Sequence, residues 1–114
     1  MKTLPVLQPL CCGPDVPPLD PDAARDLAGI FKALADPTRV AIVNRLAAGE
    51  ACCVCDLTDA FELGQPTVSH HLRILRDAGL VSSERRGTFA YYVLVPDAIE
   101  RLRGVFSPPA LVGA

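Results

Sequence analysis

Five cysteines in two short clusters are the residues of this chain with the clearest capacity for chemistry. Cys11 and Cys12 are adjacent, and Cys52, Cys53 and Cys55 lie within GEACCVCDLTDA. Thiolates are soft ligands that select zinc, Cu(I) and other thiophilic ions over hard cations. Because persistent disulfides are rare in a reducing compartment and five thiols cannot all pair, the clusters favour a metal or metalloid site over a disulfide framework.

The compartment follows from the N-terminal residues and the apolar pattern. MKTLPVLQPLCC is a poor secretion signal, because Pro5, Gln8 and Pro9 interrupt its apolar positions. No apolar run approaches the ~20 residues that a membrane helix needs. We therefore expect a cytoplasmic protein with no membrane partner, and its 114 residues fit one domain.

The spacing of the downstream cysteines limits which of them can share an ion. On a regular helix, Cys53 and Cys55 are ~200° apart, so they can share an ion only where the turn is not helical. Cys52 and Cys55 are three residues apart and share a helix face. Neither pair supplies the three sulfurs that trivalent arsenic takes, and Cys11 and Cys12 can complete the set. Geometry alone leaves the choice between Cys52 and Cys53 open.

Positioning these thiols requires folded elements, and the sequence predicts five helices and a hairpin. Asp20-Pro21 and Asp36-Pro37 each combine an N-cap residue with proline at the first helical position. The expected helices run from Pro21 through Leu34, from Pro37 to about Ala48, over 54–61, over 66–78 and over 97–105. The apolar spacing predicts a buried stripe on each of the first two helices. The stripe of the first helix is Leu27, Ile30, Phe31 and Leu34, and that of the second is Val40, Val43 and Leu46–Ala47. Residues 80–95 predict two strands joined by a turn at Arg86-Gly87.

This order of elements predicts a mainly α protein with a small β-hairpin, namely a winged helix-turn-helix. Residues 1–19 are rich in proline, and we expect them to form a flexible arm that carries Cys11 and Cys12. We expect residues 20–107 to form the winged helix-turn-helix domain and residues 108–114 to form a frayed tail.

The fourth helix has the composition of a DNA-reading helix. Val68, Leu72 and Leu75 fall on one side, together with His71, which we read as a core or interface histidine. The formal net charge is −2, but residues 63–95 carry four arginines against two acidic residues and hold both histidines. Hydroxyl, imidazole and guanidinium groups suit base edges and phosphates in the major groove, and cations beside a hairpin turn reach the DNA backbone. The candidate DNA-binding residues are Gln65, Thr67, Ser69, His70, Arg73, Arg76, Arg85 and Arg86.

Four segments together resemble the ArsR/SmtB family of winged-helix metal-sensing repressors. They are FKALADPTRVAIVNRL, CVCDL, QPTVSHHLRILRDAGLV and RRGTFAYYVL, within residues 24–105. CVCDL resembles the motif of the arsenite-responsive and cadmium/lead-responsive branches, which favours Cys53 with Cys55 over Cys52. The resemblance implies a homodimer, formed by the first and last helices, that leaves its operator DNA when an inducer binds. A two-fold dimer is expected to read an inverted repeat.

The sequence therefore predicts a repressor that releases DNA when As(III) or Sb(III) binds Cys11, Cys12, Cys53 and Cys55, with Cys52 as the substitute for Cys53. Cd(II) or Pb(II) is the alternative inducer, and oxidation of the thiols is a second alternative. Cys52 to Cys55 also has the C-x-x-C spacing of thiol oxidoreductases, but no βαβ pattern surrounds it. We therefore expect neither an enzyme nor an organic cofactor.

Overall fold

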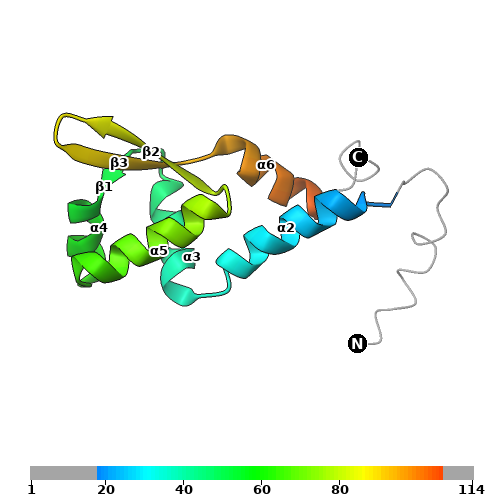
Figure 1. The fold of residues 1–114 in the computed structure, drawn as a ribbon, viewed down its shortest axis with the longest axis horizontal. Coiled ribbons are helices and arrows are strands. Elements are labelled where there is room, and N and C mark those ends of the chain that lie inside the picture. The colour runs from blue at the N-terminus through cyan, green and yellow to red at the C-terminus, as the bar shows by residue number, and fades with distance from the viewer. Residues whose placement is uncertain (1–17, 107–114) are drawn as a thin grey trace.

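The computed structural model describes residues 18–106, which form five helices and a small sheet (Figure 1). In chain order the elements are α2 (Pro21–Ala33), α3 (Pro37–Leu46), β1 (Cys52–Cys53), α4 (Val54–Phe61), α5 (Gln65–Asp77), β2 (Val81–Arg86), β3 (Phe89–Leu94) and α6 (Pro96–Val105). The predicted mainly α class with a hairpin is confirmed, and α4 and α5 are the two helices of the helix-turn-helix. Within this part of the chain, no helix is both long and apolar enough to cross a membrane.

The two Asp-Pro starts form as predicted. The Asp20 carboxylate accepts hydrogen bonds from the backbone N–H groups of Asp22 and Ala23, at 3.1 and 3.2 Å. The Asp36 carboxylate accepts from Thr38 and Arg39 at 2.9 and 3.1 Å. Each carboxylate satisfies donors that the first helical turn leaves without a partner, and the following proline has no N–H to satisfy.

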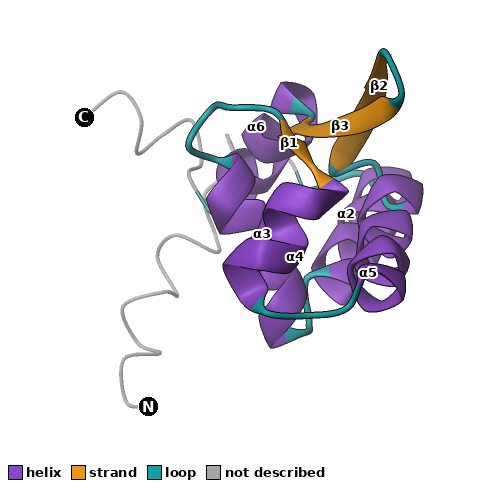
Figure 2. Cartoon of the chain, turned by 90° about the vertical axis from the view of Figure 1, so that its left-hand side faces the viewer, coloured by secondary structure: helices purple, strands orange, loops and turns teal. Residues whose placement is uncertain are grey.

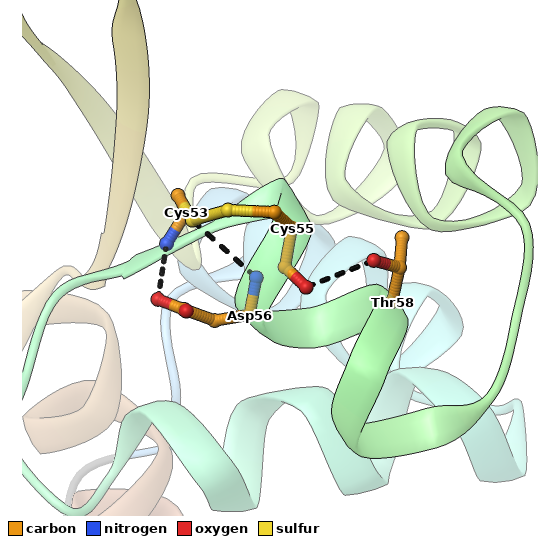
Figure 3. Close-up of a disulfide and its surroundings, with 4 residues drawn as sticks. All are labelled: Cys53, Cys55, Asp56 and Thr58. Carbon is orange, nitrogen blue, oxygen red and sulfur yellow. Dashed lines mark hydrogen bonds between the residues drawn. A yellow bond between two sulfur atoms is a disulfide. The ribbon is translucent and has the colours of Figure 1, made fainter.

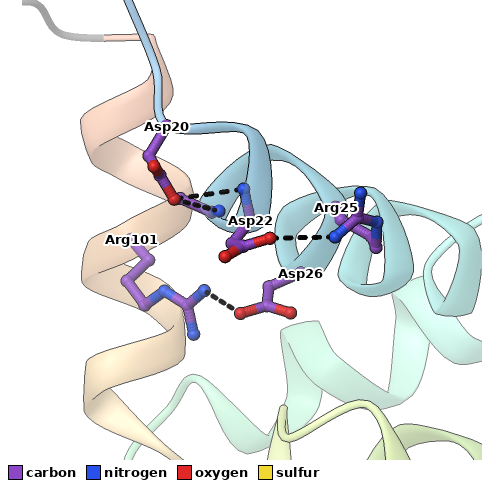
Figure 4. Close-up of polar contacts among 6 residues, drawn as sticks. Asp20, Asp22, Arg25, Asp26 and Arg101 are labelled. Carbon is purple, nitrogen blue, oxygen red and sulfur yellow. Dashed lines mark hydrogen bonds and ion pairs between the residues drawn. The ribbon is translucent and has the colours of Figure 1, made fainter.

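Helices α2 and α6 lie side by side at the end of the molecule away from the hairpin tip (Figure 1). An ion pair between Arg101 of α6 and Asp26 of α2, 3.7 Å apart, links the two helices, as Figure 4 shows. Phe31 of α2 meets Phe106 edge to face, with ring centroids 6.0 Å apart. The first and last described helices therefore form one unit.

The core gathers the inner faces of the helices and the start of β2. Ile42, Leu57 and Val68 are completely buried. Three predicted core positions are wrong: Val40 is 50% exposed, Phe31 is 40% exposed, and Ala47 is also exposed. In α3 the buried stripe is Ile42 and Leu46, and Val40 lies about 200° around the helix from Ile42. The buried residues are Leu27, Ile30, Ala33, Ile42, Leu46, Cys52, Cys53, Leu57, Val68, Leu72, Leu75, Leu80, Val81 and Ala98.

The predicted hairpin is part of a three-stranded antiparallel sheet in the order β1-β3-β2. Strand β1 pairs with β3, with Cys52 opposite Tyr92 and Cys53 opposite Tyr91. Seen from the end that carries α4, β1 leads directly into α4, and the β2–β3 hairpin projects beyond the helices (Figure 2). Gly87 has φ +66° in the hairpin turn, a conformation that costs glycine little. The sheet thus connects Cys52 and Cys53 to the β2–β3 hairpin, which is the wing of this fold.

Candidate functional site

Helix α5 carries most of the predicted DNA-facing residues on its exposed side. Gln65, Thr67 and His70 are exposed, Arg73 and Arg76 are also exposed, and Ser69 is half-buried. Val68, Leu72 and Leu75 form the buried side, as predicted. Gly64 is the N-cap and contributes no side-chain hydrogen bond to the first turn. A helix N-terminus of this kind is suited to a DNA phosphate.

The two wing arginines are held differently. Adjacent residues of a strand point to opposite faces, so Arg85 and Arg86 diverge. The Arg86 guanidinium lies 4.9 Å from the centre of the Tyr91 ring and 3.5 Å from the Glu84 carboxylate. Arg85 donates to the carbonyl oxygen of Thr88 at 3.4 Å. Both side chains remain exposed.

A chain of polar contacts fixes α5 against α3 and the end of α2. The Arg39 guanidinium donates to the carbonyl oxygen of Ala33 through Nε, and its Nη1 lies 3.2 Å from Nδ1 of His71. The backbone N–H of Arg39 lowers the pKa of the Asp36 carboxyl below its ordinary value of 3.8, and the Arg39 charge acts in the same direction. His71 therefore faces a neighbouring helix, in agreement with its predicted inward orientation. Sequence reasoning missed Arg39, although its position three residues after the N-cap Asp36 was visible.

Cys53 and Cys55 meet at the entrance to the helix-turn-helix, where they are joined by a disulfide (Figure 3). Cys53 is the N-cap of α4 with extended backbone, φ −84° and ψ 168°, and Cys55 lies in the first turn. The regular helix that would have separated the two side chains therefore does not include Cys53. The Cα atoms of the two cysteines are 5.3 Å apart, and reduction of the disulfide would give two neighbouring thiols. Cys55 is exposed, so a ligand has access to this pair.

The Cys53 sulfur also caps helix α4. It accepts a hydrogen bond from the backbone N–H of Asp56 at 3.3 Å, and the Asp56 carboxylate accepts one from the backbone N–H of Cys53 at 3.2 Å. Thr58 donates to the carbonyl oxygen of Cys55 at 2.8 Å, one turn further along (Figure 3). This reciprocal arrangement is a capping box. A ligand that binds the Cys53 sulfur therefore binds the atom that caps α4.

Asp56 is a further candidate ligand that sequence reasoning missed. One carboxylate oxygen and the two sulfurs of Cys53 and Cys55 lie within 4.8 Å of one another. The signal for it was the i, i+3 spacing from Cys53 that defines a capping box. A carboxylate is a hard ligand that suits thiophilic ions less well than a thiolate does.

Cys52 is separated from this pair. It is a core residue, 6% exposed, and its thiol donates weakly to the carbonyl oxygen of Glu50 at 3.7 Å. The prediction that Cys52 and Cys55 share one face of a helix is wrong, because Cys52 and Cys53 form strand β1. The described cysteines thus bring two sulfurs together. Cys11 and Cys12 lie outside the described residues, as do the predicted tail at 108–114 and most of the predicted arm.

A cleft of about 340 Å³ adjoins the two sulfurs. It lies between the start of α4, the first residue of α5 and the turn end of the hairpin. Its lining residues include Cys53, Cys55, Gln65, Arg85, Phe89 and Ala90. The cysteines and two of the predicted DNA-facing residues therefore border the same space.

The sequence is similar to those of known bacterial regulatory proteins. Residues 36–83 match the family model described as bacterial regulatory protein, arsR family. The arsenical resistance operon repressor of Bacillus subtilis is 46% identical over 72 residues, which cover 63% of this chain and 69% of that protein. A homolog of the cadmium resistance transcriptional regulatory protein CadC from Staphylococcus aureus is 39% identical over 77 residues, which cover 68% of this chain and 64% of that protein.

Solved structures give the same result for the fold. A homodimeric winged helix-turn-helix DNA-binding domain from Mycobacterium bovis superposes with a TM-score of 0.64 at 31% sequence identity. The match covers 79% of this chain and 85% of that domain. The likeness thus extends well beyond the helix-turn-helix.

Proposed function

Since this chain belongs to the arsR family of bacterial regulatory proteins, we propose that it is a repressor that releases operator DNA when As(III) or Sb(III) binds Cys53 and Cys55. Members of the family are DNA-binding transcriptional regulators and not enzymes. The observation that carries the proposal is the contact between the two sulfurs at the N-terminus of α4, the first helix of the helix-turn-helix. The similarity to an arsenical resistance operon repressor supports the choice of ion.

The DNA side of the proposal uses the exposed face of α5 and the wing. Side chains at the start of α5 read base edges in the major groove, and the arginines contact phosphates. Each protomer of a homodimer reads one half of an inverted repeat. The proposed contacts are Gln65, Thr67, Ser69, His70, Arg73, Arg76, Arg85 and Arg86.

The proposed dimer is built by α2 and α6. Phe31 and Phe106 are 40% and 70% exposed in the single chain, which is unfavourable for aromatic side chains in water. Their edge-to-face contact places both rings on the α2–α6 unit. The homodimeric state of the similar Mycobacterium bovis domain supports the same arrangement here.

The third sulfur for inorganic arsenic comes from Cys11 or Cys12 in this proposal. Arsenic(III) binds three thiolates in a pyramid, and the described fold brings two together. The predicted N-terminal arm would fold onto α4 of its own or the partner protomer and complete the site.

Ligand binding is coupled to DNA through the capping box and strand β1. Arsenic bonded to Cys53 repositions the sulfur that accepts the Asp56 N–H, and displacement of this acceptor weakens the start of α4. Strand β1 is paired with β3 of the wing, so a shift of Cys53 also reaches the hairpin. To lower operator affinity a hundredfold, the inducer must bind the DNA-free state more favourably than the DNA-bound state by about 2.7 kcal/mol.

Single-cysteine variants test the proposal. The operator is first selected from random DNA, and release is followed by fluorescence anisotropy while the reduced protein is titrated with arsenite. Cys55→Ser should abolish release, whereas Cys52→Ala, the matched control at the buried neighbour, should keep it. Release that persists unchanged in Cys55→Ser would show that the ligand site is elsewhere.

Two alternative signals are each supported by one observation. The similarity to a cadmium resistance regulator supports Cd(II) or Pb(II) as the inducer. The Cys53–Cys55 disulfide supports a response to oxidants, because oxidation changes the same capping residue. Titrating DNA release with cadmium, lead and antimonite under reducing conditions, and with an oxidant in the absence of metal, separates these responses.

A further inference from the structure

The two tyrosines of strand β3 have different surroundings. Tyr92 packs against the hydrophobic core, and so does Cys52, which lies opposite it in β1. Successive side chains of a strand point to opposite faces, so the half-buried Tyr91 lies on the face of the sheet away from this cluster. The packing of the core therefore explains Tyr92 but not Tyr91.

Tyr91 lies between a candidate ligand residue and a candidate DNA contact. Cys53 of β1 is directly opposite Tyr91, and such cross-strand neighbours share a face with their Cβ atoms about 5 Å apart. On the other side of β3, Glu84 of β2 is opposite Tyr91, and Arg86 follows two residues later on the same face. The Arg86 guanidinium lies over the Tyr91 ring, 4.9 Å from its centre. One aromatic ring therefore lies across from Cys53 and holds a wing arginine.

We propose that Tyr91 is a positioning residue that transmits the state of Cys53 to Arg86. Without inducer, the ring holds the guanidinium in place for an operator phosphate, because an aromatic face attracts a cation and restricts its movement. An ion bonded to the Cys53 sulfur lies beside the ring and displaces it, and Arg86 then loses its support. The inference rests on the proposed function, because it names a route by which a ligand at the same thiols weakens DNA binding.

The ion pair between Arg86 and Glu84 does not provide such a route. Its two side chains are 54% and 55% exposed, and pairs of exposed side chains contribute little to stability. Both residues also belong to β2, so a movement of β1 against the hairpin leaves their separation unchanged. Tyr91 belongs to β3, the strand that is paired with β1.

Arg85 should be independent of this route. It precedes Arg86 on β2 but points to the opposite face, and it donates to the carbonyl oxygen of Thr88 in its own hairpin. Arg86 is therefore the wing contact that the inducer weakens, and Arg85 is a contact that persists.

A double-mutant cycle tests the positioning of Arg86 and needs no inducer. Operator binding of the full reduced chain is measured by fluorescence anisotropy for Tyr91→Leu, Arg86→Ala and the double variant. We expect each single variant to lower operator affinity by about three- to tenfold for the two wings of a dimer, and the double variant to be at most about twofold weaker than Arg86→Ala. Tyr91→Phe keeps the ring and should remain within about twofold of wild type. Losses that multiply in the double variant would overturn the assignment.

The second test reads the ratio of operator affinity without arsenite to operator affinity with saturating arsenite. Tyr91→Leu and Arg86→Ala should each lower this ratio by about three- to tenfold, because they remove a contact that is made only without inducer. Arg85→Ala, the matched control at the adjacent position, should weaken binding in both states and leave the ratio unchanged. Because each variant is compared with itself, a uniform weakening of DNA binding cancels from the ratio.

The outcomes separate this inference from the proposed function. A wild-type ratio in Tyr91→Leu, together with release by arsenite, would overturn the inference and leave the proposed function standing. An equal loss of the ratio in Arg85→Ala and Arg86→Ala would also overturn it, because the ligand would then act on the whole wing. Wild-type protein that keeps its operator in arsenite would instead refute the proposed function, and the cycle would still decide whether Tyr91 positions Arg86.

Discussion

Nη1 of Arg39 lies 3.2 Å from Nδ1 of His71, and this contact joins α3 to the recognition helix α5. A guanidinium group can only donate hydrogen bonds, so this contact is a hydrogen bond in the His71 tautomer whose Nδ1 is the acceptor. The same guanidinium group donates to the carbonyl oxygen of Ala33 in the last turn of α2. One arginine therefore ties together three helices, and α5 carries most of the candidate DNA contacts.

Removing the acceptor at His71 should loosen α5. In His71→Leu the half-buried Arg39 donor loses its partner, which predicts a loss of ~1–2 kcal/mol in the free energy of unfolding and weaker operator binding. His71→Asn places an amide oxygen near the position of Nδ1 and should recover most of both. Urea unfolding and DNA anisotropy measure the two effects. Equal behaviour of the Leu and Asn variants would mean that the hydrogen bond does not position α5.

Replacing Arg73 with alanine should weaken operator binding chiefly through the loss of a phosphate contact. The slope of log affinity against log salt should fall by about one for each protomer. Arg45→Ala removes the same charge from the exposed C-terminal turn of α3 and serves as the control, with an unchanged slope. Anisotropy titrations between low and moderate salt measure both slopes. A slope unaffected by Arg73→Ala would remove this residue from the DNA interface.

A charge at Phe31 should separate the proposed dimer. Phe31→Glu places a carboxylate on the α2–α6 unit, where burial in an interface would cost several kcal/mol without a partner. Sedimentation velocity should find a monomer, and operator affinity should fall with it. Val40→Glu makes the same change at an exposed apolar position of α3 and should remain dimeric. Dimeric Phe31→Glu would exclude this face as the interface.

The pH dependence of stability should contain a contribution from Asp36. Its folded-state pKa is lowered, chiefly by the hydrogen bond from the backbone N–H of Arg39. A carboxyl group with a lowered folded pKa stabilises the fold above its unfolded pKa, and this stabilisation is lost as the pH falls through the folded value. Asp36→Ala should therefore be less stable than wild type at pH 7. The difference should shrink below pH ~4 in thermal unfolding, and a difference independent of pH would contradict the assignment.

Local signals were sufficient for most of the fold. Asp20 and Asp36, each followed by proline, start helices because a carboxylate cap and a fixed φ act within four residues. The helical period of Val68, Leu72 and Leu75 predicted the buried side of α5 for the same reason. Val40 and Phe31 show the limit of this approach. Apolar type marks a residue for burial, but the packing of neighbouring helices selects the side that is covered.

The thiol site, like the fold, was predictable from the sequence only in part. The sequence by itself determined the helix-turn-helix and the hypothesis of a soft-ligand site in which Cys55 belongs to either candidate pair, because these depend on residue type and short-range period. Only the tertiary structure decided that Cys53, and not Cys52, meets Cys55. The reason is the pairing of β1 with Tyr91 and Tyr92 of β3, a contact across some forty residues of sequence. It keeps Cys52 and Cys53 extended, so that α4 begins only at Val54, and it leaves Cys52 in the core.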